Sequence, residues 1–136
     1  MTDQKVFKIT MSERCFRFKP DALPSHAPPK PGVYEFVTFD EQKNGVVLFV
    51  GLALEKTVFQ CLSDHMMGLA KPTAADLFAA AKDVYFDYVA DADISDLEDL
   101  KDIAGALIAK GHPRFNSDDV PTSGRYAGGV AVEEIG

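Results

Sequence analysis

The stretch PGVYEFVTFDEQKNGVVLFVG, residues 31–51, decides the fold that we predict for this chain. Residues 33–39 are rich in the β-branched and aromatic side chains that favour strands. Asn44-Gly45 is the strongest short signal for a hairpin turn. Residues 46–50 form an unbroken apolar run, which is typical of a strand covered on both faces. We therefore expect two paired strands here, with Gly51 closing the second.

The chain after this hairpin carries helical signals. Residue pairs 57/60, 73/76 and 95/98 have the spacing of the capping box that begins many helices. Residues 84–89 read as a third strand between the second and third of these helices. The order strand, strand, helix, helix, strand, helix predicts an α+β fold, with a small, mostly antiparallel, three-stranded central sheet flanked by about three helices.

The flanking segments are less regular. Residues 6–10 and 15–18 alternate in polarity and predict an N-terminal hairpin extension. Residues 23–32 contain four prolines and are expected to form an extended lead-in. Residues 130–132 are a candidate for a late edge strand. We divide the chain into an N-terminal strand pair with its proline-rich lead-in at 1–32, a core domain at 33–116 and a C-terminal tail at 117–136.

Composition limits the setting of the protein. The sequence is 46% hydrophobic, which is enough for a core at this length. No apolar run approaches the length that spans a membrane, and the N-terminus lacks the apolar segment of a signal peptide. Cys15 and Cys61 are too few and too far apart to indicate a disulfide framework or a zinc site. We expect a cytoplasmic protein with no membrane contact.

The net charge of −7 is unevenly spread. Residues 1–32 carry six basic and three acidic side chains, whereas residues 33–136 carry eight basic and eighteen acidic ones. Nucleic-acid affinity depends mainly on neutralising phosphates. Nucleic acid is therefore not expected on the acidic body, and the basic N-terminal segment is the one place where it could bind.

Three short motifs in a fixed order resemble the GIY-YIG nuclease family. They are Gly32-Val33-Tyr34 after a proline, Phe49-Val50-Gly51, and the closing segment that ends in His112-Pro113-Arg114-Phe115-Asn116. The resemblance covers about residues 31–116 and implies the α+β fold described above. It also implies a divalent metal on a glutamate, a tyrosine that helps to activate water, and a second tyrosine and an arginine that serve the attacked phosphate.

Several of these groups are missing when the resemblance is followed residue by residue. Tyr34 matches the first tyrosine, with a sheet-packing tyrosine as the alternative interpretation, and Gly51 matches the motif glycine. Phe49 stands at the second tyrosine and lacks its hydroxyl. Phe59 stands near the arginine, and the imidazole of His65 is the only basic group in residues 57–70.

The metal ligand is missing as well. Ala104 stands at the position of the glutamate, and the residues three or four positions away on the same helical face are not carboxylates. Asn116 matches the family's closing asparagine, whose expected role is to satisfy nearby backbone groups.

Two other groupings were considered. Cys61 and His65 are four residues apart on one predicted helix, which suits a nucleophile and its base or half of a metal site. The simpler interpretation is a buried thiol beside a histidine. The acidic residues between 91 and 102 are expected to be a solvated loop and helix start, or else a contact for a basic protein.

The sequence thus predicts a catalytically degenerate GIY-YIG-like protein that acts as a binding or regulatory module, through a protein partner and with no cofactor. The alternative is an active endonuclease with a displaced active site, which would require Mg²⁺ or Mn²⁺. Losing a transition-state cation costs roughly 10³-fold or more in phosphoryl transfer, so we do not expect an enzyme.

Overall fold

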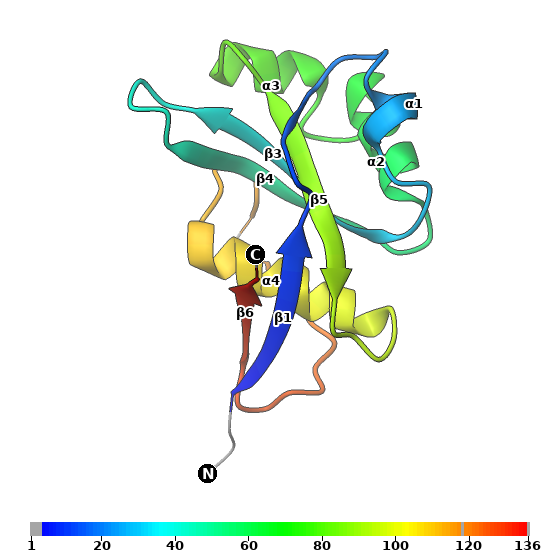
Figure 1. Cartoon of the computed structure of the whole chain (residues 1–136), viewed down its shortest axis with the longest axis vertical. Helices are drawn as coiled ribbons and strands as arrows, with labels where there is room; N and C mark the ends of the chain where they lie inside the picture. Colours follow the sequence, from blue (N-terminus) through cyan, green and yellow to red (C-terminus); the bar gives the residue numbers. More distant parts are fainter. Residues whose placement is uncertain (1–3, 118, 136) are drawn as a thin grey trace.

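The computed structural model describes residues 4–117 and 119–135, so the first three residues of segment 1–32 and positions 118 and 136 of the predicted tail lie outside the described residues. These described residues form an α+β fold, with one curled mixed sheet and four helices (Figure 1). The strands are β1 (Lys5–Met11), β2 (Phe16–Arg17), β3 (Gly32–Phe39), β4 (Gly45–Ala53), β5 (Tyr85–Ala92) and β6 (Val130–Glu134). The helices are α1 (Leu23–His26), α2 (Val58–Met66), α3 (Ala74–Ala80) and α4 (Glu98–Gly111).

The sheet is larger than the predicted three strands. Its order is β4-β3-β5-β1-β6, with β2 pairing further along β5. The antiparallel strands β4, β3 and β5 are the three that the sequence predicts. The prediction of an N-terminal hairpin is wrong, because β1 and β2 each pair with β5 and not with each other. Alternating polarity identifies a strand but not its partner, and the predicted late edge strand is β6, parallel to β1.

The hairpin of β3 and β4 is confirmed, with its turn at residues 40–44. The connection is closed by Asp40, whose carboxylate accepts from the Asn44 backbone N–H at 2.8 Å. Lys43, with φ of 65°, is the residue in the left-handed conformation. Gly45 instead begins β4 and pairs with Phe39.

Two of the three predicted capping boxes are present. The side chains of Thr57 and Thr73 each accept from the backbone N–H three residues later, at the starts of α2 and α3. The third predicted capping box, at Ser95 and Glu98, is wrong. Helix α4 begins at Glu98 without a side-chain cap, and the backbone N–H and hydroxyl of Ser95 donate hydrogen bonds to Asp99.

The proline-rich lead-in is not fully extended. Its residues Leu23–His26 form the single turn α1. Pro24 stands in the first turn of a helix, where no backbone N–H is required.

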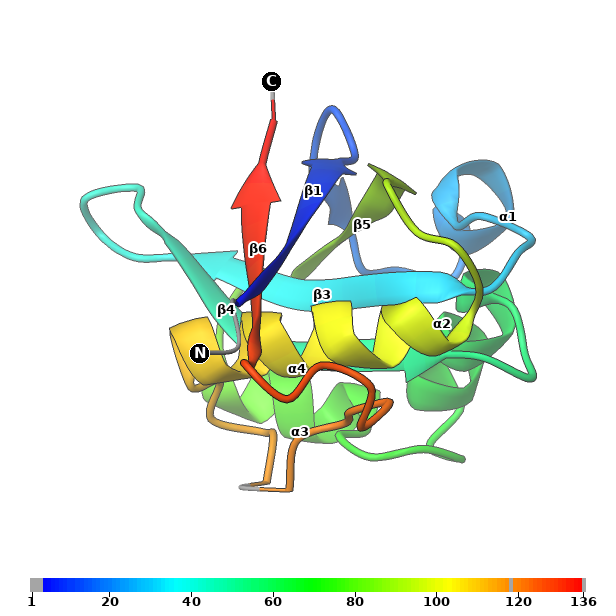
Figure 2. The ribbon, with the colours of Figure 1, turned by 90° about the horizontal axis from the view of Figure 1, so that it is seen from below.

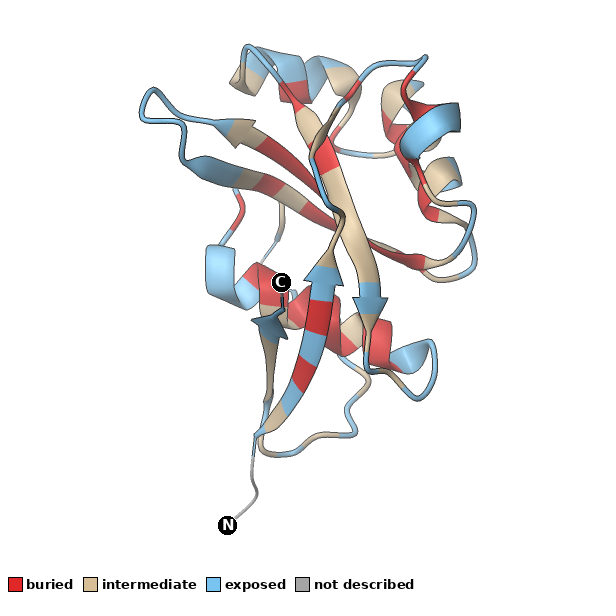
Figure 3. Cartoon of the chain, in the orientation of Figure 1, coloured by how far each residue is buried: buried red, intermediate tan, exposed pale blue. Residues whose placement is uncertain are grey.

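The sheet separates two hydrophobic clusters. The first cluster contains Tyr34 and Phe36, and the second contains Val33 and Ala104. Side chains alternate along β3, so Tyr34 and Phe36 face α1, α2 and α3, whereas Val33 faces α4. Figure 2 shows α4 lying across the sheet on that second face. Figure 3 shows the same alternation of buried and exposed residues along β1, in which exposed Lys8 lies between buried Phe7 and Ile9.

Gly51 is required by the ring of Tyr34. The two residues are directly opposite each other on β4 and β3. A Cβ atom added to Gly51 would overlap the Cζ atom of Tyr34. The tyrosine and glycine of the two motifs therefore form one packing unit across the hairpin.

The chain itself covers part of the β4 edge of the sheet. The Asn116 amide donates to the Val50 carbonyl at 3.0 Å and accepts from the Val50 N–H at 2.8 Å. The Phe115 N–H donates to the Leu48 carbonyl at 3.1 Å. Asn116 thus satisfies backbone groups of β4, which is the role expected for the closing asparagine.

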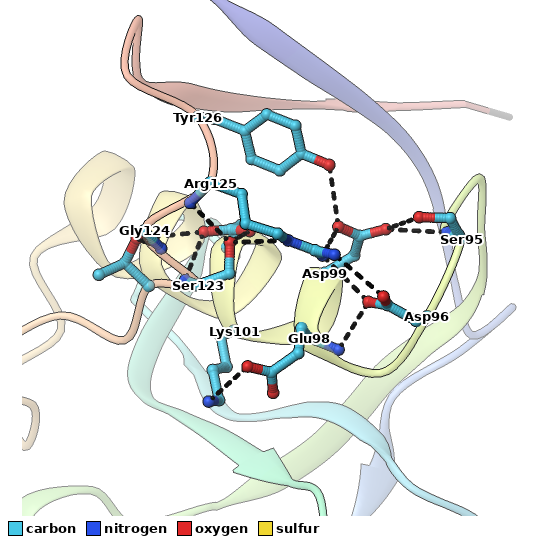
Figure 4. A network of polar contacts seen from close by, with 11 residues as sticks. Ser95, Asp96, Glu98, Asp99, Lys101, Ser123, Gly124, Arg125 and Tyr126 are labelled. Carbon is cyan, nitrogen blue, oxygen red and sulfur yellow. Dashed lines mark hydrogen bonds and ion pairs between the residues drawn. The ribbon is translucent and has the colours of Figure 1, made fainter.

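A C-terminal strap, residues 121–126, ties the segment before β6 to α4 (Figure 4). Buried Asp99 accepts from Ser95, from the Tyr126 hydroxyl at 3.0 Å and from Arg125. Buried Asp102 accepts from Thr122 and Ser123. The expectation that the acidic residues between 91 and 102 are simply solvated is therefore wrong for these two carboxylates, which anchor the strap.

Candidate functional site

Tyr34 on β3 and His65 on α2 meet in the first hydrophobic cluster. A distance of 2.7 Å joins the Tyr34 hydroxyl to Nε2 of His65. On its other side, Nδ1 of His65 lies 2.8 Å from the Pro72 carbonyl. A carbonyl only accepts, so Nδ1 carries a proton. In the neutral imidazole, Nε2 then accepts from the Tyr34 hydroxyl, and the ring links Tyr34 to the backbone.

Aromatic rings enclose the imidazole. The ring centroids of Phe36 and Phe49 lie 5.0 and 5.4 Å from that of His65, both in edge-to-face arrangements. Tyr34 and His65 are each only 3% exposed. Of the residues proposed from the sequence, the structure brings together Tyr34, Phe49, His65 and Gly51. These residues pack against one another in the core, and none of them lines an open site.

Burial changes the proton affinities of the pair. It raises the pKa of the Tyr34 hydroxyl, with the nearby Cys61 thiol adding to this effect. It lowers the pKa of His65, which the backbone acceptor at Pro72 only partly opposes. Both changes favour the neutral forms. Nε2 of His65 is engaged by Tyr34 and Nδ1 by the Pro72 carbonyl, so neither ring nitrogen is free to act as a base for Cys61, which was the alternative considered from the sequence.

The remaining positions of the resemblance lie elsewhere. Phe59 is half-buried on α2, against the first cluster. Ala104 is fully buried at 0% exposure in the second cluster, on the opposite face of the sheet from Tyr34. Asn116 is at the β4 edge. These positions therefore do not converge around Tyr34.

A catalytic divalent metal does not fit these residues. Mg²⁺ and Mn²⁺ require oxygen ligands, whereas Ala104 and Phe49 have none in their side chains and the Tyr34 hydroxyl is engaged by His65. Within residues 4–117 and 119–135, no three His, Cys, Asp or Glu side chains converge as metal ligands do.

A second polar pair, formed by one buried and one half-buried carboxyl group, was not predicted from the sequence. Glu35 on β3 lies opposite Asp87 on β5, and Glu35 is only 8% exposed. The Cys15 thiol donates to Oδ2 of Asp87 over 3.8 Å, while Oδ1 of Asp87 is buried with no partner among the described residues. The available signal was an acidic residue flanked on both sides by aromatic side chains, in Tyr34-Glu35-Phe36 and in Phe86-Asp87-Tyr88.

Burial, reinforced by the carboxylate of Asp87, raises the pKa of Glu35 to about 9. Like charges directly opposite each other on neighbouring strands are destabilising. Glu35 is therefore protonated at neutral pH, when its carboxyl group is able to donate to Asp87.

Comparison of the chain with protein-family models, with curated proteins and with solved structures found no match. The resemblance to the GIY-YIG family thus remains a prediction from the motifs. None of the helices in the described part of the chain is long and apolar enough to cross a lipid bilayer.

Acid should destabilise the protein through His65. Its folded pKa is lowered from the ordinary value of 6.5, so the unfolded state binds the proton first. The contribution of His65 to the free energy of unfolding should then be fully present above pH 6.5 and fall as the pH drops below that value. We expect His65→Gln to remove this contribution, so that in urea titrations between about pH 8 and about pH 5 the free energy of unfolding of the variant falls less on acidification than that of the wild type.

Exposed His26 provides the control for this test, and His26→Gln should keep the wild-type slope. In the wild type and in both variants, Glu35 changes the free energy of unfolding in the opposite direction. Its raised folded pKa contributes stability that is lost as the pH increases. The difference between wild type and His65→Gln isolates the histidine. An unchanged slope in His65→Gln contradicts the neutral, buried assignment.

Ala104→Glu should be severely destabilising. The new carboxylate would be buried among Leu100, Ile103 and Leu107. We expect a loss of roughly 3 kcal/mol or more in unfolding free energy. Ala109→Glu, at an exposed position on the same helix, is the matched control and should change stability by only about 0.5 kcal/mol.

Thermal melts with and without Mn²⁺ measure this difference. Because Ala104 lies across the sheet from Tyr34, the metal should not restore the stability of the variant. A melting temperature equal to that of wild type, or one raised by Mn²⁺ in the variant alone, would show that position 104 still faces an open site.

Proposed function

We propose that this chain is a catalytically inactive GIY-YIG-like protein that acts as a binding or regulatory module through contacts with a protein partner. The observation that carries the proposal is the buried hydrogen bond between Tyr34 and His65. A tyrosine that activates water must present its hydroxyl to the substrate. Here the hydroxyl is buried, and its proton is directed to Nε2 of His65.

The positions of the other groups support the same conclusion. Ala104 offers no ligand, and it is packed on the far face of the sheet from Tyr34. Phe49 has no hydroxyl, and Phe59 supplies no cation for a phosphate. The acidic charge of residues 33–136 also opposes the approach of a polyanion.

An apolar groove between α1 and α2 suits a protein segment better than a nucleic acid. It is lined by Pro20, Leu23, Pro24, Phe59, Ser63, Met66 and Met67. Met67 is 65% exposed, and methionine side chains adapt to varied apolar partners. Because the body is acidic, the occupant that we propose is a basic segment carrying apolar anchor residues.

The purified protein should cleave neither DNA nor RNA in the presence of Mg²⁺ or Mn²⁺. Incubation with plasmid, single-stranded DNA and single-stranded RNA measures this directly. Tyr34→Phe is the control, since it removes only the hydroxyl. Cleavage that disappears in Tyr34→Phe overturns the proposal, whereas cleavage unaffected by it identifies a contaminating nuclease.

Peptides selected from a displayed random library should combine apolar residues with Lys or Arg and should bind in the groove. Met67→Glu should weaken the binding of a selected peptide by roughly tenfold or more, as loss of an anchor contact does. Leu97→Ser, at another exposed apolar residue before α4, should leave it unchanged. Failure to select such peptides, or loss of binding in the Leu97 variant alone, argues against the groove.

A further inference from the structure

Among the residues that the structure describes, the outer edge of β6 pairs with no other strand. β6 is the last strand in the sheet order, with β1 on one side and no strand on the other in the described part of the chain (Figure 1). The Lys5 N–H donates to the Gly129 carbonyl at 3.0 Å, and the Ile135 N–H donates to the Ile9 carbonyl at 2.8 Å. Alternate residues of a strand point their backbone groups to opposite sides. The N–H and C=O groups of Val130, Val132 and Glu134 therefore point away from β1.

This edge has few of the features that usually protect a free strand. Proteins often place proline, lysine or a bulge at such an edge, but β6 reads Val-Ala-Val-Glu-Glu and pairs with β1 without a shift in register. Val6 and Ile135 beside it are exposed apolar side chains. The opposite edge, at β4, is by contrast partly covered by Phe115 and Asn116.

A cleft beside β6 has room for further side chains. It is lined by Ala106, Ala109 and Lys110 of α4 and by Val130, Ala131 and Val132 of β6. The small alanine side chains leave the α4 face of the strand open. Apolar residues of an added strand would enter this cleft on the same face as Val130 and Val132.

We propose that β6 pairs with β6 of a second copy of this chain, antiparallel and about a twofold axis at Val132. The pattern of outward groups permits this arrangement. With Val132 opposite its own copy, Val130 lies opposite Glu134, and all of these residues point their free N–H and C=O groups at each other. The contact is self-complementary, as a twofold interface must be.

Charge complementarity favours this occupant. Lys5 lies beside Val130, and Ile9 lies beside Glu134, in the parallel register of β1 and β6. In the pair, Lys5 of one copy and Glu134 of the other flank the same Val130, two strand spacings apart on the α4 face. Their long side chains reach across roughly 10 Å. Within one chain the same two residues are separated by four residues along the strands, roughly 13 Å, so they meet only between copies.

The β6 contact is separate from the groove between α1 and α2, and neither depends on the other. A variant that disrupts the β6 contact should therefore leave peptide binding in the groove unchanged, and a variant of the groove should leave the β6 contact unchanged. The pairing extends the sheet through the two copies and adds an interaction surface to the proposed binding module.

A charge-reversal cycle tests the pairing. Sedimentation of the wild type over a wide range of concentration should show a monomer–dimer equilibrium. Lys5→Glu and Glu134→Lys should each weaken the dimer by roughly tenfold, because a twofold pair contains the contact twice. The double variant, Lys5→Glu with Glu134→Lys, should restore wild-type association. Thermal melts of each variant at low concentration verify that the monomer remains folded.

Hydrogen exchange provides a second, independent measurement. The Val132 amide should become protected as the protein concentration rises, whereas the Ala131 amide, which points to β1, should be protected at every concentration. Three results would each overturn the proposal. They are a wild type that stays monomeric at every concentration, single variants that associate as strongly as the wild type, and a Val132 amide whose exchange rate does not change with concentration.

Discussion

One residue, Tyr34, contacts three elements around the first hydrophobic cluster, namely β4, β5 and α2. Its ring lies against Gly51 of β4, its hydroxyl bonds to His65 of α2, and its backbone pairs with both β4 and β5. A buried acceptor left without its donor costs about 1–3 kcal/mol. The arrangement therefore requires a hydroxyl at position 34 and the absence of a Cβ at position 51, which explains both residues without any catalytic role. Helix α2 is fixed over the hairpin by a hydrogen bond as well as by apolar burial.

Signals that act over a few residues predicted much of this fold. The strands of the β3–β4 hairpin, the caps at Thr57 and Thr73 and the role of Asn116 each depend on a short stretch of chain and the groups beside it. The strand partners of β1 and β6 depend instead on pairings across about 80 to 125 residues. Periodicity does not specify such pairings.

The candidate site was predictable only as a set of positions. The sequence drew attention to Tyr34, Phe49 and His65 through motif spacing and through the lack of other basic groups in residues 57–70. It did not indicate that the imidazole would accept the tyrosine proton. That bond follows from packing α2 on the sheet, and the pair of Glu35 and Asp87 likewise follows from the pairing of β3 with β5. Contacts of this kind require the tertiary structure.

Consecutive residues of β3 thus place a buried, neutral polar group on each face of the sheet, and the two groups oppose each other in pH. His65, the partner of Tyr34, favours folding above pH 6.5, where its imidazole is neutral in both states. Glu35 contributes most below its ordinary pKa of 4.5, and this contribution is lost as the pH rises through about 9. Between pH 4.5 and 6.5 the two slopes have opposite signs and partly cancel. The folded state therefore tolerates two buried titratable groups without a steep pH dependence in this range, because neither of them has to carry a charge inside the core.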